Sequence, residues 1–194
     1  MKIVISNTGE VSKPFIERIH LIKGDITDQE TDAIAMVIPQ DMQFSGGINT
    51  ALQEACGYNL DEFILDNIYK PKIGDVYALP AGNLKAKHLI VGVVPYYRTE
   101  FDHNDSHLSG TVRRIMELSR CMLLSSISFP PIFSGKNGFP RPKAARLICQ
   151  GINDRMQEAF EEVRIVCDDD AYMEIFERKL NVLGWDGGNS SHHP

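Results

Sequence analysis

The fold is decided by one stretch of sequence, RIHLIKGDITDQETDAIAMVIP, residues 18–39. It holds two short runs rich in branched apolar residues, at 18–23 and 33–38, and a polar turn between them that begins at Gly24 and Asp25. Short apolar runs bounded by turn residues predict strands buried inside a sheet. A glycine turn directly after such a strand is typical of open α/β sheets, which bind ligands at the carboxyl ends of their strands.

Similar runs recur along the chain and alternate with segments of helical period. Further strands are predicted at 2–6, 75–79, 88–94, 126–129 and 163–167. Apolar residues spaced along one helix face predict helices over 48–56, 60–68, 112–123, 142–156 and 172–180. The alternation favours an α/β sheet covered by helices on both faces. Since there is no internal repeat or low-complexity linker, we expect a single domain over residues 1–185 and a flexible polar tail over 186–194.

Composition narrows the classes of function. The chain has 194 residues, of which 43% are hydrophobic and 24% charged, as in ordinary globular proteins. A net charge of −6 argues against a duplex-DNA partner, because that binding depends on clustered Lys and Arg. A small anion remains an acceptable ligand, since backbone N–H groups at helix starts can hold it without net positive charge.

The cysteines and the apolar runs indicate the compartment. The four cysteines form no C-x-x-C pair and have no histidine at zinc-ligand spacing, so we expect no metal and no cofactor. The first apolar run is too short for a signal peptide, and no stretch approaches the length of a membrane span. These features predict a cytoplasmic protein without a membrane partner.

Three glycine-containing turns follow predicted strands. The first holds Asp25, whose carboxylate can accept hydrogen bonds from an exocyclic amine or simply cap the turn. The second, SGG at 45–47, leads into a helix whose start favours an anion, although a flexible connection is the alternative. The third is SGKNG at 134–138. Two loops of this kind, if they meet in space, would close on a diphosphate from opposite sides.

In order and spacing, these segments resemble the macrodomain family. The resemblance rests on IHLIKGDIT at 19–27, TDAI at 31–34, GGI at 46–48, ACG at 55–57, KHLI at 87–90, SISFPPI at 126–132, GFP at 138–140 and VRIV at 163–166. It spans about residues 17–180. It implies a three-layer α/β/α fold with a central mixed sheet, and a crevice that takes free ADP-ribose, a close relative of it, or ADP-ribosylated proteins.

The resemblance also implies roles for individual residues. Asp25 would accept a hydrogen bond from the adenine amine, and Ile26 would give a backbone contact to the ring. The first diphosphate loop would consist of Ser45, Gly46, Gly47 and Ile48. The second would consist of Ser134, Gly135, Lys136, Asn137 and Gly138.

The chain departs from the family where hydrolytic members carry their polar groups. Met36 replaces the asparagine that reaches the distal ribose, and Asn49 replaces the aspartate that helps to activate water. An amide has no useful basicity near neutral pH, so Asn49 is no general base. Val91 and Cys167 stand where the family often has a histidine and an aromatic residue that stacks on adenine.

These departures favour a binding module over the family's usual enzyme. One alternative is an ADP-ribosyl hydrolase, or an enzyme that processes ADP-ribose-1''-phosphate, with a non-standard active site. Another is a scaffold that has lost its nucleotide and now binds a protein or RNA, of which the acidic net charge makes RNA the weaker choice.

Overall fold

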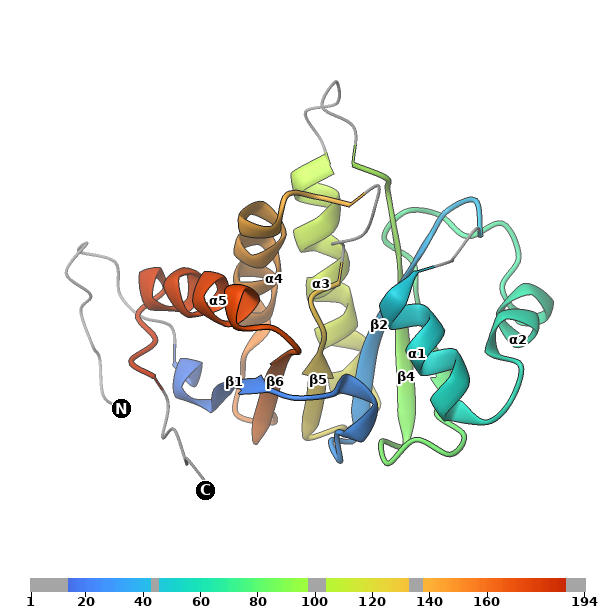
Figure 1. Cartoon of the computed structure of the whole chain (residues 1–194), viewed down its shortest axis with the longest axis horizontal. Helices are drawn as coiled ribbons and strands as arrows, with labels where there is room; N and C mark the ends of the chain where they lie inside the picture. Colours follow the sequence, from blue (N-terminus) through green and yellow to red (C-terminus); the bar gives the residue numbers. More distant parts are fainter. Residues whose placement is uncertain (1–13, 43–45, 98–103, 133–137, 188–194) are drawn as a thin grey trace.

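The computed structural model of the chain describes residues 14–42, 46–97, 104–132 and 138–187 (Figure 1). Within them, six strands form one sheet and five α-helices pack around it. The strand predicted at 2–6 and most of the predicted tail lie outside the described residues. No helix in the described part of the chain is long and apolar enough to cross a membrane.

The sheet is mixed, in the order β1-β6-β5-β2-β4-β3. Its strands are β1 (Ile19–Lys23), β2 (Ala33–Pro39), β3 (Val76–Pro80), β4 (His88–Val94), β5 (Ser126–Phe129) and β6 (Glu162–Cys167). All neighbours are parallel except the edge strand β3, which pairs antiparallel with β4. Two short 3-10 helices, η1 (Ile16–Arg18) and η2 (Ile26–Asp28), flank β1.

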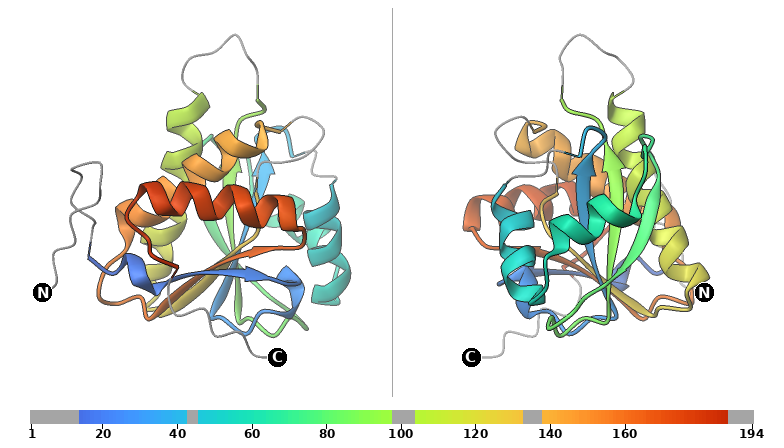
Figure 2. Two further views of the ribbon diagram at one scale, coloured as in Figure 1. Left: turned by 60° about the vertical axis from the view of Figure 1, so that its left-hand side comes forward. Right: turned by 90° about the vertical axis from the view of Figure 1, so that its right-hand side faces the viewer.

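Helices cover both faces of the sheet (Figure 2). One face carries α1 (Gly47–Cys56) and α2 (Leu60–Asn67), and the other carries α3 (Asn104–Cys121), α4 (Arg141–Arg155) and α5 (Asp170–Val182). The predicted three-layer α/β/α architecture is therefore confirmed.

Strand β2 shows why its sequence is apolar throughout. Ala33 and Ala35 belong to the core under α3, α4 and α5, while Ile34, Met36 and Ile38 belong to the core under α1 and α2. Successive side chains of a strand point to opposite faces, so a strand covered on both sides carries apolar residues at nearly every position.

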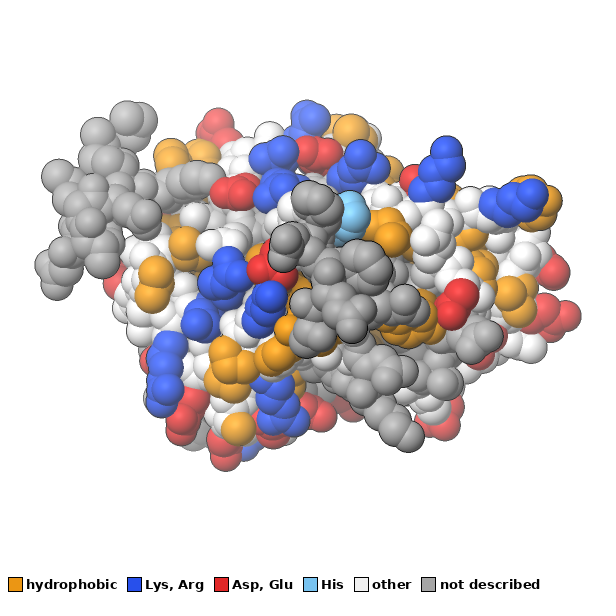
Figure 3. Space-filling view, turned by 90° about the horizontal axis from the view of Figure 1, so that it is seen from above, with side chains coloured by type: hydrophobic (Ala, Val, Ile, Leu, Met, Phe, Trp, Pro, Cys, Tyr) orange, Lys and Arg blue, Asp and Glu red, His pale blue; other side chains and the backbone are white. Residues whose placement is uncertain are grey.

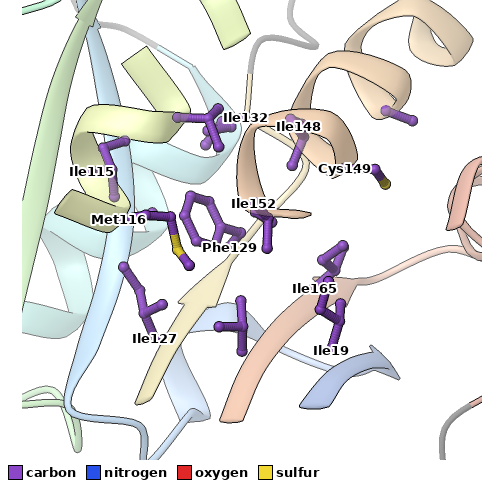
Figure 4. Close-up of a cluster of buried hydrophobic side chains, with 14 of the residues drawn as sticks. Ile19, Ile115, Met116, Ile127, Phe129, Ile132, Ile148, Cys149, Ile152 and Ile165 are labelled. Atoms are coloured by element: carbon purple, nitrogen blue, oxygen red, sulfur yellow. The ribbon is translucent and has the colours of Figure 1, made fainter. Parts of the chain in front are cut away.

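The larger core is tightly packed between the sheet and helices α3 and α4. Figure 4 shows Phe129 of β5 lying among Met116, Ile127 and Ile152, and all four are fully buried. The two helices approach closely because α4 carries Gly151, where an added Cβ would lie 2.7 Å from Val112. Loss of that glycine would therefore push the helices apart.

Most predicted strands end within one residue of their observed ends, whereas α3 begins well before the predicted start at 112. The first turns of α3 are polar, so they carry no apolar stripe. Asp105 instead pairs with Lys143 (2.9 Å) and Arg146 (3.3 Å) of α4. Contacts between helices support a segment that apolar periodicity alone does not identify.

Candidate functional site

The candidate residues that the structure describes follow the carboxyl ends of β1, β2 and β5. Of these strands, β2 and β5 are parallel neighbours that connect to opposite faces of the sheet, since β2 leads to α1 and β5 leads to α4. Connections that diverge in this way define a topological switch point, the usual place for a ligand in an open α/β sheet. We call the carboxyl edge around β2 and β5 the switch point. Figure 3 views the molecule from this side and, away from the residues drawn in grey, shows Lys and Arg side chains with some acidic side chains among them.

Asp25 follows β1 at this edge and caps η2. Its Oδ1 accepts hydrogen bonds from the Thr27 backbone N–H (2.8 Å) and the Thr27 hydroxyl (2.7 Å). The residue is exposed, and among the described residues no hydrogen bond reaches its Oδ2. Ile26 is buried beneath it. One carboxylate oxygen therefore serves the local fold, and the other is available to an external donor.

The ends of β1 and β6 are joined at the same edge. The Gly24 N–H donates to the Cys167 carbonyl (2.9 Å), which brings Asp25 close to the acidic residues that follow β6. Of these, Asp169 accepts a hydrogen bond from the Tyr172 N–H (2.7 Å) and pairs with Arg141 (3.6 Å). The Arg141 guanidinium also lies over the Tyr172 ring, 4.4 Å from its centroid.

Cys167, where the family often has an aromatic residue, is fully buried in the larger core. Burial, helped by the charges of Asp169 and Asp168, raises the pKa of its thiol to about 12. The neutral thiol is therefore a packing group, and it offers no aromatic face for a base to stack on.

Helix α1 starts beside the switch point without a side-chain cap. Gly46 is the N-cap residue and accepts from the Thr50 N–H (2.8 Å), while Gly47 and Ile48 form the first turn. Among the described residues, a Cβ added at Gly46 or Gly47 would have no heavy atom within 4 Å, so neither position is packed against another element. N–H groups of a first helical turn have no partner within their own helix, and they favour an anion. Ser45, the other residue of this predicted loop, lies outside the described residues.

Only the last residue of the second predicted loop is described. Ser134, Gly135, Lys136 and Asn137 lie outside the described residues. Gly138 is half-buried and is followed by Phe139, whose ring packs on Tyr97 with 4.9 Å between centroids. Pro140 is then the N-cap of α4. Gly46 and Gly138 thus precede helices on opposite faces of the sheet. Two loops that hold a diphosphate from opposite sides need this arrangement.

The two replaced family positions have structural roles. Met36 is fully buried under α1 and α2, so its side chain does not reach the switch point. The Asn49 side chain donates from Nδ2 to the Val37 carbonyl (3.0 Å), which ties α1 to the end of β2. The Asn49 amide therefore acts here as a hydrogen-bond donor within the fold.

Sequence reasoning missed a pair of side chains at this edge. The Tyr96 hydroxyl, beyond β4, donates to both carboxylate oxygens of Asp41, beyond β2, at 3.0 and 3.1 Å. Only the pairing of β2 with β4 brings these residues together, so no local sequence signal marks them. Within the described ranges, no group of three or more His, Cys, Asp or Glu side chains is arranged to hold a metal ion.

Comparison with known proteins gives consistent similarities. A family model described as "Macro domain" matches residues 39–148. A macro domain-containing protein from Caldanaerobacter subterraneus subsp. tengcongensis is 31% identical over 173 residues, 86% of this chain and 98% of the relative. An O-acetyl-ADP-ribose deacetylase from Escherichia fergusonii is 28% identical over 86% of this chain and 97% of its own.

Solved structures agree with the sequence matches. The Oceanobacillus iheyensis macrodomain with ADP has a TM-score of 0.76 at 26% identity, covering 84% of this chain and 90% of that chain. A mutant of that macrodomain was solved with ADPR. The macro domain of ganglioside induced differentiation associated protein 2 has a TM-score of 0.79 at 20% identity, covering 88% of this chain and 86% of its own, a similarity of fold.

Proposed function

Because the chain belongs to the macrodomain family, we propose that its switch point binds ADP-ribose, either free or attached to a protein. The observation that carries the proposal is that the two carboxylate oxygens of Asp25 have different partners. Asp25 is an exposed residue whose Oδ1 holds the turn through Thr27, whereas its Oδ2 has no partner among the described residues. A carboxylate oxygen in that state is a suitable acceptor for the exocyclic amine of adenine.

The start of α1 supplies the complementary group for the diphosphate. The helix begins at Gly46, Gly47 and Ile48 without a side-chain cap, and its backbone donors and dipole favour an anion there. The proposed diphosphate site is completed by Ser45 and by the second loop, Ser134, Gly135, Lys136, Asn137 and Gly138. Ile26 lies beside the base in this proposal. The related macrodomain solved with ADP supports this choice of ligand.

The sharpest test changes one oxygen of Asp25. Asparagine also caps helices well, so Asp25→Asn should keep the turn at Thr27 while replacing an acceptor by a donor. By titration calorimetry, the wild type should bind ADP about tenfold more tightly than inosine 5′-diphosphate, which has a carbonyl in place of the amine. Asp25→Asn should lose that preference.

Thr27→Val is the matched control, because it removes a hydroxyl that donates to Oδ1 and leaves Oδ2 untouched. It should retain the preference for ADP. A wild type that binds neither nucleotide nor ADP-ribose would contradict the proposed function. An unchanged preference in Asp25→Asn would contradict the role of Asp25.

The second candidate function is hydrolysis of ADP-ribosyl linkages or processing of ADP-ribose-1''-phosphate. Similarity to the O-acetyl-ADP-ribose deacetylase favours it, whereas Asn49, whose amide is not basic, opposes it. Release of acetate from O-acetyl-ADP-ribose, or of ADP-ribose from modified glutamate, distinguishes the two. We expect the buffer rate; release clearly above that rate would establish an enzyme.

We also propose a cytoplasmic location. All four cysteines are free thiols, and Cys56, Cys149 and Cys167 are buried. Free cysteines are usual in a reducing compartment, which supports this proposal.

A further inference from the structure

Asp25 belongs to the connection between β1 and β2, residues 24–32, which crosses one face of the sheet. Strands β6 and β5 lie between β1 and β2, so this connection has to pass over both of them. It does so on the face of α1 and α2, because Ile26 of the connection and Val166 of β6 both belong to the core under these helices. The segment that carries Asp25 therefore lies against β6.

A buried glutamine joins this connection to β6. Gln29 directly follows η2 and is only 7% exposed. Its Nε2 donates to the Asp25 carbonyl (2.8 Å), and its Oε1 accepts from Nη1 of Arg164 in β6 (3.1 Å). Burial of an amide is costly unless the amide is hydrogen-bonded. Here both ends of the Gln29 side chain are bonded, one to the backbone of Asp25 and the other to the neighbouring strand.

The chemistry of the two partners fixes the orientation of the Gln29 amide. A guanidinium group has donors and no acceptor, whereas a backbone carbonyl only accepts. If the amide were turned over, its oxygen would face the Asp25 carbonyl and its NH₂ group would face the Arg164 guanidinium. Only the observed orientation satisfies both partners, so Gln29 presents a donor to Asp25.

Arg164 is held in turn by a carboxylate on its own strand. Glu162 and Arg164 are two residues apart in β6, so their side chains share one face of the sheet. Arg164 donates from Nε to Oε1 of Glu162 (2.7 Å) and from Nη2 to Oε2 (3.1 Å). This paired geometry fixes the plane of the guanidinium and leaves Nη1 directed at Gln29.

Asp25 is thus held through both its backbone and its side chain. Its carbonyl accepts from Gln29 and also from the Asp28 N–H (3.2 Å), and its Oδ1 accepts from Thr27. With the carbonyl and Oδ1 held, the direction of Oδ2 is set by the fold before a ligand binds. A binding group that is already in its bound geometry loses less entropy on binding, which strengthens the contact that it makes.

We propose that Gln29 is a positioning residue for base recognition: held by Arg164 and Glu162, it keeps Asp25 in the orientation that accepts the adenine amine. The inference rests on the proposed function and deepens it, since it assigns part of the base selectivity to residues that do not contact the base. Arg164 and Glu162 act on the base only through Gln29.

The test is the ratio of the affinities for ADP and inosine 5′-diphosphate, measured by titration calorimetry. Gln29→Leu keeps an apolar group of similar size in the buried site and removes both hydrogen bonds. It should reduce the wild-type preference for ADP about three- to tenfold, the effect of losing one well-placed hydrogen bond. Damage to the fold alone would weaken both nucleotides in equal proportion and leave the ratio unchanged.

Arg164→Met provides a second variant at a partly exposed position, in case Gln29→Leu is poorly folded. It should reduce the preference about twofold, because Gln29 loses the partner that orients its amide. When combined with Gln29→Leu, Arg164→Met should change the ratio no further, since its route to Asp25 has already been removed. Effects that add in the double variant would contradict a route through Gln29.

Thr31→Val is the matched control for a lost buried polar group. Thr31 is buried in the same connection, and its hydroxyl contacts the Ala33 carbonyl (2.9 Å) and the Ser128 hydroxyl (2.7 Å). This variant should keep the wild-type ratio.

A wild-type ratio in Gln29→Leu, whether or not both affinities fall, overturns the proposal and leaves the proposed function intact. A wild type without a preference for ADP, or one that binds neither nucleotide, overturns the proposal together with the role of Asp25.

Discussion

The hydrogen bond of Asn49 explains why replacing this residue by an acid should not by itself create a hydrolase. The Asn49 Nδ2 donates to the Val37 carbonyl, and a carboxylate at this position would place negative charge against that oxygen. Loss of the bond should lower the free energy of unfolding of Asn49→Asp by about 1 to 3 kcal/mol. The favourable interaction of an acid with a helix start should offset roughly 0.3 to 1 kcal/mol of that loss. Urea unfolding measures this difference.

Hydrolysis by Asn49→Asp should remain near the buffer rate, because the new carboxylate turns away from Val37 and Met36 offers the ribose no contact. Thr50→Asp is the control, since Thr50 is exposed in the same helical turn and has no bond to Val37. It should be neutral or slightly stabilising. Wild-type stability in Asn49→Asp together with rapid hydrolysis would refute this view of Asn49.

Single residues also mark how far the sequence could lead. It left open whether Asp25 caps a turn or meets a ligand; the structure shows the cap, and the ligand contact stays a prediction. It identified Met36 and Asn49 as departures, but the burial of one and the bond of the other depend on how α1 packs on β2. The contact between Asp41 and Tyr96 joins two distant segments, so it needed the strand order.

Among the secondary-structure elements, the junction of α3 with α4 depends on one glycine. A Cβ at Gly151 would lie 2.7 Å from Val112 and 3.0 Å from the Ser109 carbonyl. We expect Gly151→Ala to destabilise the protein by about 1 to 3 kcal/mol through overpacking. Thermal or urea unfolding provides the measurement.

Gly110 in α3 is the matched control, because among the described residues its Cβ would meet only Arg113, at 3.8 Å. Gly110→Ala should stabilise by up to about 1 kcal/mol, the usual gain in helix propensity. A stabilising effect of Gly151→Ala like that expected for Gly110→Ala would contradict the close packing of α3 against α4 at Gly151.

The short pairing of β2 with β5 is reinforced by Asp32. The strands pair only at Ala33–Ile127 and Ile34–Ser128, and the Asp32 carboxylate accepts from the Ser125 N–H (3.0 Å) and hydroxyl (3.1 Å). Partial burial alone would raise the pKa of Asp32, but these bonds and Lys87 lower it below its ordinary value of 3.8.

Since the folded-state pKa of Asp32 is depressed, its stabilisation is present above pH 3.8 and is lost as the pH falls through the lower folded value. Asp32→Asn should reduce the melting temperature at neutral pH, and the difference from wild type should shrink in acid. Asp66→Asn, at an exposed position of α2, is the control and should keep the wild-type melting temperature at neutral pH. A difference that does not depend on pH would argue against an ionised Asp32 at this junction.

The elements were predictable to different degrees for physical reasons. Strands buried on both faces have dense apolar runs, so β2 and β4 stand out in the sequence. The start of α3 is stabilised by Asp105 through Lys143 and Arg146, and such ion pairs leave no periodic signal. Strand order and register, which create the switch point, came only with the structure.

For the molecule as a whole, we propose that residues 1–185 form one cooperative domain. The single tryptophan, Trp185, is buried after α5 and donates from Nε1 to the Ile19 carbonyl of edge strand β1 (2.8 Å). Its fluorescence should therefore report the same unfolding transition as the circular dichroism of all helices. Coincident urea curves are expected; two separated midpoints would indicate independently unfolding parts.

The central claim is that ADP-ribose lies across the carboxyl edge of the sheet, and a crystal structure of the complex tests it most directly. The account predicts the adenine amine within hydrogen-bond distance of Asp25 Oδ2 and the diphosphate against the N–H groups that start α1 at Gly47 and Ile48. ADP-ribose bound elsewhere on the molecule, with the switch point empty at saturating ligand, would contradict it.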